Sequence, residues 1–76
     1  MDAEMARDHL AQAERHVAQG ERHIARQREI IAELERDGHD TAQARATLAQ
    51  FEEIQAMHVA ERDRLRRELN VQPQSR

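Results

Sequence analysis

One short segment divides the chain into two long stretches that favour helix, and this division most constrains the fold. Gly38 lies in the sequence ERDGHDT, and the only proline, Pro73, lies in the polar C-terminal sequence NVQPQSR. On either side of ERDGHDT the chain is rich in Ala, Glu, Arg, Gln and Leu, which are strong helix formers. The sequence therefore predicts helix at about 3–37, a turn at 38–40, helix at about 41–69 and a flexible tail at 71–76.

The residues around Gly38 fit a tight connection between antiparallel helices. Glycine readily adopts the left-handed conformation that follows many helix C-termini. On the other side of the turn, Asp40 or Thr41 can accept a backbone N–H as the N-cap, and Asp40 with Gln43 resembles a capping box. We therefore expect one all-α domain, at residues 1–70, in which two helices form an antiparallel, coiled-coil-like hairpin.

Hydrophobic residues recur at helical spacing on both predicted helices. The first helix has two core positions of a heptad pattern, called a and d, and position d holds unusually small side chains in its first half. Position a is occupied by Leu10, Val17, Ile24 and Ile31, and position d by Ala6, Ala13, Gly20, Gln27 and Leu34. The second helix is less regular, because Gln55 and Arg62 interrupt a stripe formed by Ala44, Leu48, Phe51, Ile54, His58, Leu65 and Leu69. Its spacing is closer to the 3.6-residue period of a straight helix.

Folding the chain back about residue 39 predicts which residues of the two helices face each other. This register pairs Gly20 with His58 and Ile24 with Ile54. A glycine inside a helix costs ~1 kcal/mol relative to alanine. We therefore expect Gly20 to be retained because it leaves room for the ring of His58.

A single hairpin leaves hydrophobic side chains outside the predicted contact between its helices. They include Ile30, Met57, Val59 and a column of alanines at positions 11, 18, 25 and 32. A small domain buries too little surface to tolerate this easily, and a second copy would cover these side chains in a homodimeric four-helix bundle. The predicted interface residues are Leu10, Ala13, Val17, Gly20, Ile24, Ile31, Leu34, Leu48, Phe51, Ile54, His58, Leu65 and Leu69.

The composition excludes several classes of site. The 76 residues contain no Cys, Trp or Tyr and one Phe, which excludes a disulfide framework, a CxxC zinc site, a thiol nucleophile and an aromatic platform for nucleic acid. No serine-histidine-aspartate set, glycine-rich phosphate loop or paired-carboxylate site is recognisable. We therefore expect no catalytic residues, no cofactor and no enzymatic activity. The acidic N-terminal sequence and the lack of any run near ~18 apolar residues predict a cytoplasmic protein that does not bind membranes.

Histidines recur every seven residues on the first predicted helix, at His9, His16 and His23. This spacing separates them by ~10 Å along the helix, so two of them cannot bind the same zinc ion. No metal site is predicted; the alternative is a site between the helices, with the candidate ligands His16, His23, His58 and Glu61. The predicted register also places His9 near Glu68 and His16 near Glu61.

Four arginines, at positions 62, 64, 66 and 67, lie close together near the end of the second predicted helix. Arginine can bind phosphate groups through two nitrogens at once, so this cluster suggests nucleic acid. However, Glu61, Asp63 and Glu68 neutralise most of its charge, and the chain has 12 basic residues, all Arg, against 15 acidic ones. Nucleic-acid binding is therefore the weakest of the functions considered.

The stretch LERDGHDTAQARATLAQFEEIQAMHVAERDRLRREL resembles short bacterial proteins of unknown function. In these proteins a turn of the form (I/L)xxLERDGHDT precedes a second helix containing FE, His and Arg. The resemblance covers residues 28 to 69, and the repeated RH-hydrophobic-Ala pattern of the first helix matches loosely. It implies a helical hairpin and carries no activity, ligand or partner.

These features together favour a non-enzymatic structural or protein-interaction module. We expect a self-associating hairpin that acts as a small adaptor or regulator and presents an Arg- and Glu-rich surface to a protein partner of unknown identity. The two alternatives are a metal-binding helical bundle and an accessory nucleic-acid binder.

Overall fold

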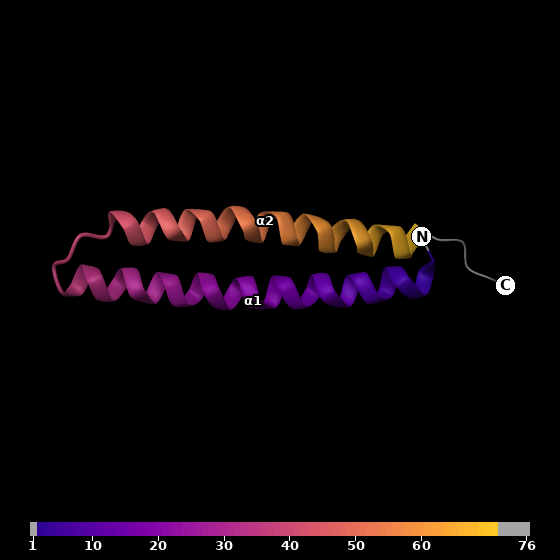
Figure 1. The fold of residues 1–76 in the computed structure, drawn as a ribbon, viewed down its shortest axis with the longest axis horizontal. Helices are drawn as coiled ribbons and strands as arrows, with labels where there is room; N and C mark the ends of the chain where they lie inside the picture. Colours follow the sequence, from indigo (N-terminus) through magenta and orange to yellow (C-terminus); the bar gives the residue numbers. More distant parts are fainter. Residues whose placement is uncertain (1, 72–76) are drawn as a thin grey trace.

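The computed structural model describes residues 2–71, which form two helices joined by one short turn (Figure 1). Helix α1 spans Ala3–Arg36 and helix α2 spans Ala42–Val71. The helices run antiparallel and side by side, so that the start of α1 lies next to the end of α2 (Figure 1). The predicted all-α hairpin is confirmed for the described residues, which contain no strand. Of the predicted tail at 71–76, Val71 belongs to α2 and residues 72–76 lie outside the described residues.

The connection between the helices follows the local signals in the sequence. Gly38 has a φ of 73°, in the left-handed region that glycine tolerates. The N–H of Gly38 donates to Glu35 O at 3.1 Å and the N–H of His39 donates to Leu34 O at 2.9 Å, which is the hydrogen-bond pattern of a Schellman motif. Asp40 then accepts a hydrogen bond from the N–H of Ala42 at 3.0 Å. These contacts satisfy backbone groups that would otherwise be unpaired at the two helix ends.

The register of the two helices differs from the predicted one by about three residues, almost one helical turn. The side chain nearest to Gly20 is that of Gln55, not His58 as expected. An ideal Cβ added to Gly20 would lie 1.8 Å from Oε1 of Gln55. The prediction that Gly20 makes room for a side chain of the second helix is therefore confirmed, but the predicted partner was wrong.

This register makes the second helix as regular as the first. Its core positions alternate in steps of three and four residues, as in a heptad repeat, once Gln55 and Arg62 are included instead of Ile54. They are Ala44, Leu48, Phe51, Gln55, His58, Arg62, Leu65 and Leu69, and none of them is exposed. The predicted pairing of Ile54 with Ile24 is wrong, because Ile54 lies outside this series and is 50% exposed. The two residues that appeared to interrupt the stripe belong to it.

The core between the helices is small. Its buried hydrophobic residues are Ala6, Ala13, Val17, Ile31 and Leu65. Leu65, 1% exposed, is the only large side chain that is fully buried in the described chain. Three large hydrophobic residues are at least half exposed: Met5 at 52%, Ile54 at 50% and Met57 at 71%. The hairpin therefore covers only part of its hydrophobic surface.

Candidate interaction face

Ion pairs join the two helices along one side of the core. Glu14 accepts from Arg66 at 3.2 Å, and Arg28 donates to Glu52 at 3.3 Å. Arg45 donates to Glu35 at 2.6 Å. The three α1 residues, at positions 14, 28 and 35, share one heptad position next to the core, and so do their partners on α2. All the ion pairs between helices in residues 2–71 lie on this side.

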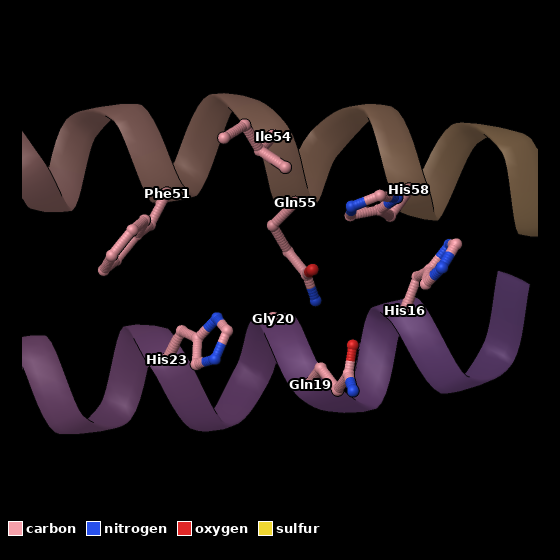
Figure 2. A pocket seen from close by; sticks show the side chains of 8 residues that line it. All are labelled: His16, Gln19, Gly20, His23, Phe51, Ile54, Gln55 and His58. Carbon is pink, nitrogen blue, oxygen red and sulfur yellow. The ribbon is translucent and has the colours of Figure 1, made fainter.

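The opposite side carries rings instead of ion pairs. The ring centroids of His16 and His58 are 4.9 Å apart, and those of His23 and Phe51 are 5.9 Å apart. In Figure 2 the histidines of α1 face the rings of α2 across the contact between the helices. Because His16 and His23 occupy the heptad position on the other side of the core from Glu14 and Arg28, the hairpin has two chemically different sides.

A shallow cavity of about 230 Å³ lies on this second side. It is lined by His16, Gln19, Gly20, His23, Phe51, Ile54, Gln55 and His58. We call these eight residues, with the neighbouring Met57, the histidine face. The face contains no acidic residue and no arginine, and Ile54 and Met57 supply exposed hydrophobic surface to it.

Charged side chains border the histidine face at both ends. Towards the turn, Arg26 forms an ion pair with Glu29 at 3.2 Å and approaches Glu33 at 3.7 Å. Towards the other end of the hairpin, where α1 begins and α2 ends, Arg64 forms ion pairs with Glu61 and Glu68, both at 2.5 Å. An uncharged centre with a charged border is the arrangement of many protein interfaces.

Gln55 is the polar residue at the centre of the hairpin. Its side chain extends from α2 towards Gly20 (Figure 2), and Nε2 donates to the backbone carbonyl of Val17 at 2.9 Å. Its Oε1 is buried and has no hydrogen-bond partner. Gln27, two core layers nearer the turn, makes a matching bond from Nε2 to Ala44 O at 2.9 Å. Polar side chains at core positions fix the register of coiled coils, so these two bonds favour the observed one.

The candidate metal ligands do not form one cluster. His16 and His58 are adjacent, whereas His23 contacts Phe51 instead. The carboxylate of Glu61 accepts hydrogen bonds from Arg64, which lower the pKa of Glu61 below its usual range and raise the pKa of Arg64. Among the described residues no group of three or more His, Cys, Asp or Glu side chains could hold a metal ion.

No ion pair joins His9 to its predicted neighbour Glu68 among the contacts of residues 2–71. Glu68 is engaged by Arg64, while His9 lies near enough to Glu61 to contribute, after Arg64, to lowering the pKa of that carboxyl. His9, His16 and Glu61 all line a second cavity of about 210 Å³. The expected proximity of His16 to Glu61 is thus present, without an ion pair between them among the contacts of residues 2–71.

Three of the four arginines in the α2 cluster are paired with carboxylates. Arg62 forms an ion pair with Asp63 at 3.1 Å, and Arg64 and Arg66 are held by the acidic partners described above. A phosphate group would have to displace these carboxylates. The structure therefore adds nothing in favour of nucleic-acid binding.

The other predicted interface residues lie between the helices, but their burial differs. Ala13, Val17, Ile31 and Leu65 are buried. The half-buried ones are Leu10, Gly20, Ile24, Leu34, Leu48, Phe51, His58 and Leu69. Sequence reasoning missed Gln55 and Arg62 as core positions, although their spacing from Leu48 and Leu69 was a readable signal.

Comparisons with protein-family models, with curated proteins and with solved structures found no significant match to this chain. Neither helix of residues 2–71 contains a stretch long and apolar enough to cross a membrane. The geometry of the hairpin itself is therefore what bears on its function.

Proposed function

We propose that the protein is a non-enzymatic interaction module whose hairpins pair through the histidine face, giving a homodimeric four-helix bundle. The observation that carries this proposal is the asymmetry of the two sides. One side is occupied by ion pairs between the helices, whereas the other presents half-covered rings with Ile54 and Met57 exposed beside them. Exposed hydrophobic patches of this kind are typical of protein-interaction sites.

A second copy is the partner that fits this face best. The face carries no charge when its histidines are neutral, so two copies can meet without repulsion about a two-fold axis. A helix of 30 residues is about 45 Å long and two helices are about 20 Å wide, so the whole side of the hairpin that carries the histidine face, with its charged borders included, offers roughly 900 Å². A stable interface needs roughly 800 Å² from each partner.

Light scattering combined with size exclusion tests the proposal. The native chain, kept in a metal chelator, should elute as a dimer at micromolar concentration. Ile54→Lys places an unpaired ammonium group in the proposed interface. Because burying such a charge costs well over 1.4 kcal/mol, the dissociation constant of the dimer should rise at least tenfold.

Ala56→Lys is the matched control. Ala56 is exposed on α2, on the side that carries the ion pairs between helices, and its replacement adds the same charge to the same helix. The Ala56→Lys variant should remain dimeric. A monomeric native chain, or a dimer that survives Ile54→Lys but not Ala56→Lys, would rule out pairing through the histidine face.

The paired hairpins would leave the Arg- and Glu-rich surfaces of both copies outside. We infer that these surfaces contact a larger protein, so that the dimer acts as an adaptor or small regulator. Purification of the native chain and of its Ile54→Lys variant from the host tests this role. A partner that is captured by the dimer and lost with the monomer supports it.

A further inference from the structure

We propose that His16 and His58 form a two-imidazole chelate for a divalent late transition-metal ion. The two residues come from different helices, and their ring centroids are 4.9 Å apart with the ring planes inclined at 44°. Both side chains are half-buried and line the same cavity. Neither takes part in an ion pair among the contacts of residues 2–71, and Glu61, which lines a neighbouring cavity with His16, is held by Arg64.

The separation of the rings is that of two imidazoles bound to one ion. With metal–nitrogen bonds of about 2.0–2.1 Å, each ring centre lies roughly 3.2 Å from the metal, and two ligands at about 90–110° have ring centres roughly 4.5–5.2 Å apart. The observed 4.9 Å falls within this range. Rotation of each ring about its Cβ–Cγ bond, where histidine has little preference, can direct a nitrogen of each residue to a shared ion.

The donor set favours copper and nickel over other divalent ions. Imidazole nitrogens suit Cu²⁺, Ni²⁺ and Zn²⁺, and affinities for a given nitrogen site generally peak at Cu²⁺. A structural zinc site needs four protein ligands, whereas two imidazoles leave positions that water can fill. We therefore expect the order Cu²⁺, then Ni²⁺, with Mn²⁺ weakest.

A metal held by these two residues would link the helices of one chain. Because an ion bound only by the folded hairpin stabilises that fold, binding should raise the melting temperature. At free metal about five times the dissociation constant, the rise for a chain of this size is roughly 4–8 °C. An ion bound along a single helix or at the chain ends would not depend on both His16 and His58.

The test is a titration of the untagged chain with Cu²⁺ or Ni²⁺ salts, followed by calorimetry and by thermal melting. His16→Ala and His58→Ala should each abolish the rise in melting temperature. His23→Ala is the matched control, because His23 lies on the same face, seven residues from His16, and contacts Phe51 rather than a second histidine. Its rise should equal that of the native chain.

The same titration at low and at high chain concentration separates this proposal from self-association. Both ligands belong to one chain, so the rise should be the same at both concentrations. No rise in the native chain, a rise that survives His16→Ala or His58→Ala, or one that disappears in His23→Ala would each overturn the site. A rise seen only at the high chain concentration would show that a second copy supplies ligands and would overturn a chelate within one chain. If the native chain is a monomer in chelator but shows, in the separate metal titration, the rise that depends on His16 and His58, only the proposed dimer is contradicted.

Discussion

Gly20→Ala is the substitution whose outcome depends most directly on the observed register. In an ordinary helix interior, replacing glycine by alanine stabilises by roughly 0.5–1 kcal/mol. Here the added Cβ would lie 1.8 Å from Oε1 and 2.6 Å from Cδ of Gln55. These distances are far shorter than any contact between non-bonded atoms, so the Gln55 side chain must leave its place between the helices.

The free energy lost when the Gln55 side chain leaves its place between the helices can be calculated approximately from its contacts. Its hydrogen bond to Val17 O is worth roughly 1 kcal/mol, and its two CH₂ groups gain at most about 0.8 kcal/mol each from burial. The buried Oε1 without a partner opposes these terms by roughly 1–2 kcal/mol. The side chain is thus held between the helices by about 1 kcal/mol, which cancels the gain in helix propensity from Gly20→Ala.

A double-mutant cycle separates the two effects. Gly20→Ala alone should leave the melting temperature nearly unchanged. In the Gln55→Ala background the clash is absent, and the same substitution should raise the melting temperature by roughly 2–8 °C. Circular dichroism at one fixed chain concentration measures all four proteins. An equal rise in both backgrounds would refute the contact between Gly20 and Gln55, and with it the register.

Three further substitutions test other parts of the hairpin. Leu65→Ala removes the fully buried large side chain and should cost about 2–5 kcal/mol in urea unfolding. Met57→Ala, compared with it in the Ile54→Lys variant, should cost little, and equal losses would contradict the described core. Gly38→Ala adds a Cβ that meets no atom within 4 Å, so its cost of roughly 1–2 kcal/mol reflects only the left-handed backbone, and Gly38→Asn should lose less of the urea midpoint. The lowered pKa of Glu61 means that its ion pair with Arg64 stabilises the fold above the usual carboxyl pKa and is lost as pH falls through the lowered value. Melting temperatures of the native chain and Glu61→Gln should therefore differ at about pH 7 and converge as the pH falls through the lowered pKa of Glu61, and a difference that stays constant on acidification would count against this ion pair.

The hairpin and its turn could be predicted because their signals are local. Gly38 occupies the left-handed position, Asp40 accepts the N–H of Ala42, and the heptad spacing of α1 needs no knowledge of its partner. Each of these features depends on a few neighbouring residues, and the structure confirms the two-helix arrangement they predict.

The register could not be predicted from the hydrophobic pattern, because it depends on which side chain of α2 fills the space beside Gly20. A hydrophobic pattern includes Ile54 in the core and treats Gln55 as an interruption, whereas the space above Gly20 accepts a long polar side chain. The difference between the two sides of the hairpin was present in the sequence, as histidines at one heptad position and Glu14, Arg28 and Glu35 at another.

The adjacency of the start of α1 and the end of α2 (Figure 1) determines how the hairpin would respond to mechanical load. Tension applied between Ala3 and Asn70 pulls the helices apart from one end, so that contacts break one after another instead of sharing the force. The contact between Ala6 and α2 is the first to break, whereas the turn at Gly38 opens last. The hairpin should unfold at low force and refold readily, because the intact turn keeps the two helices close together.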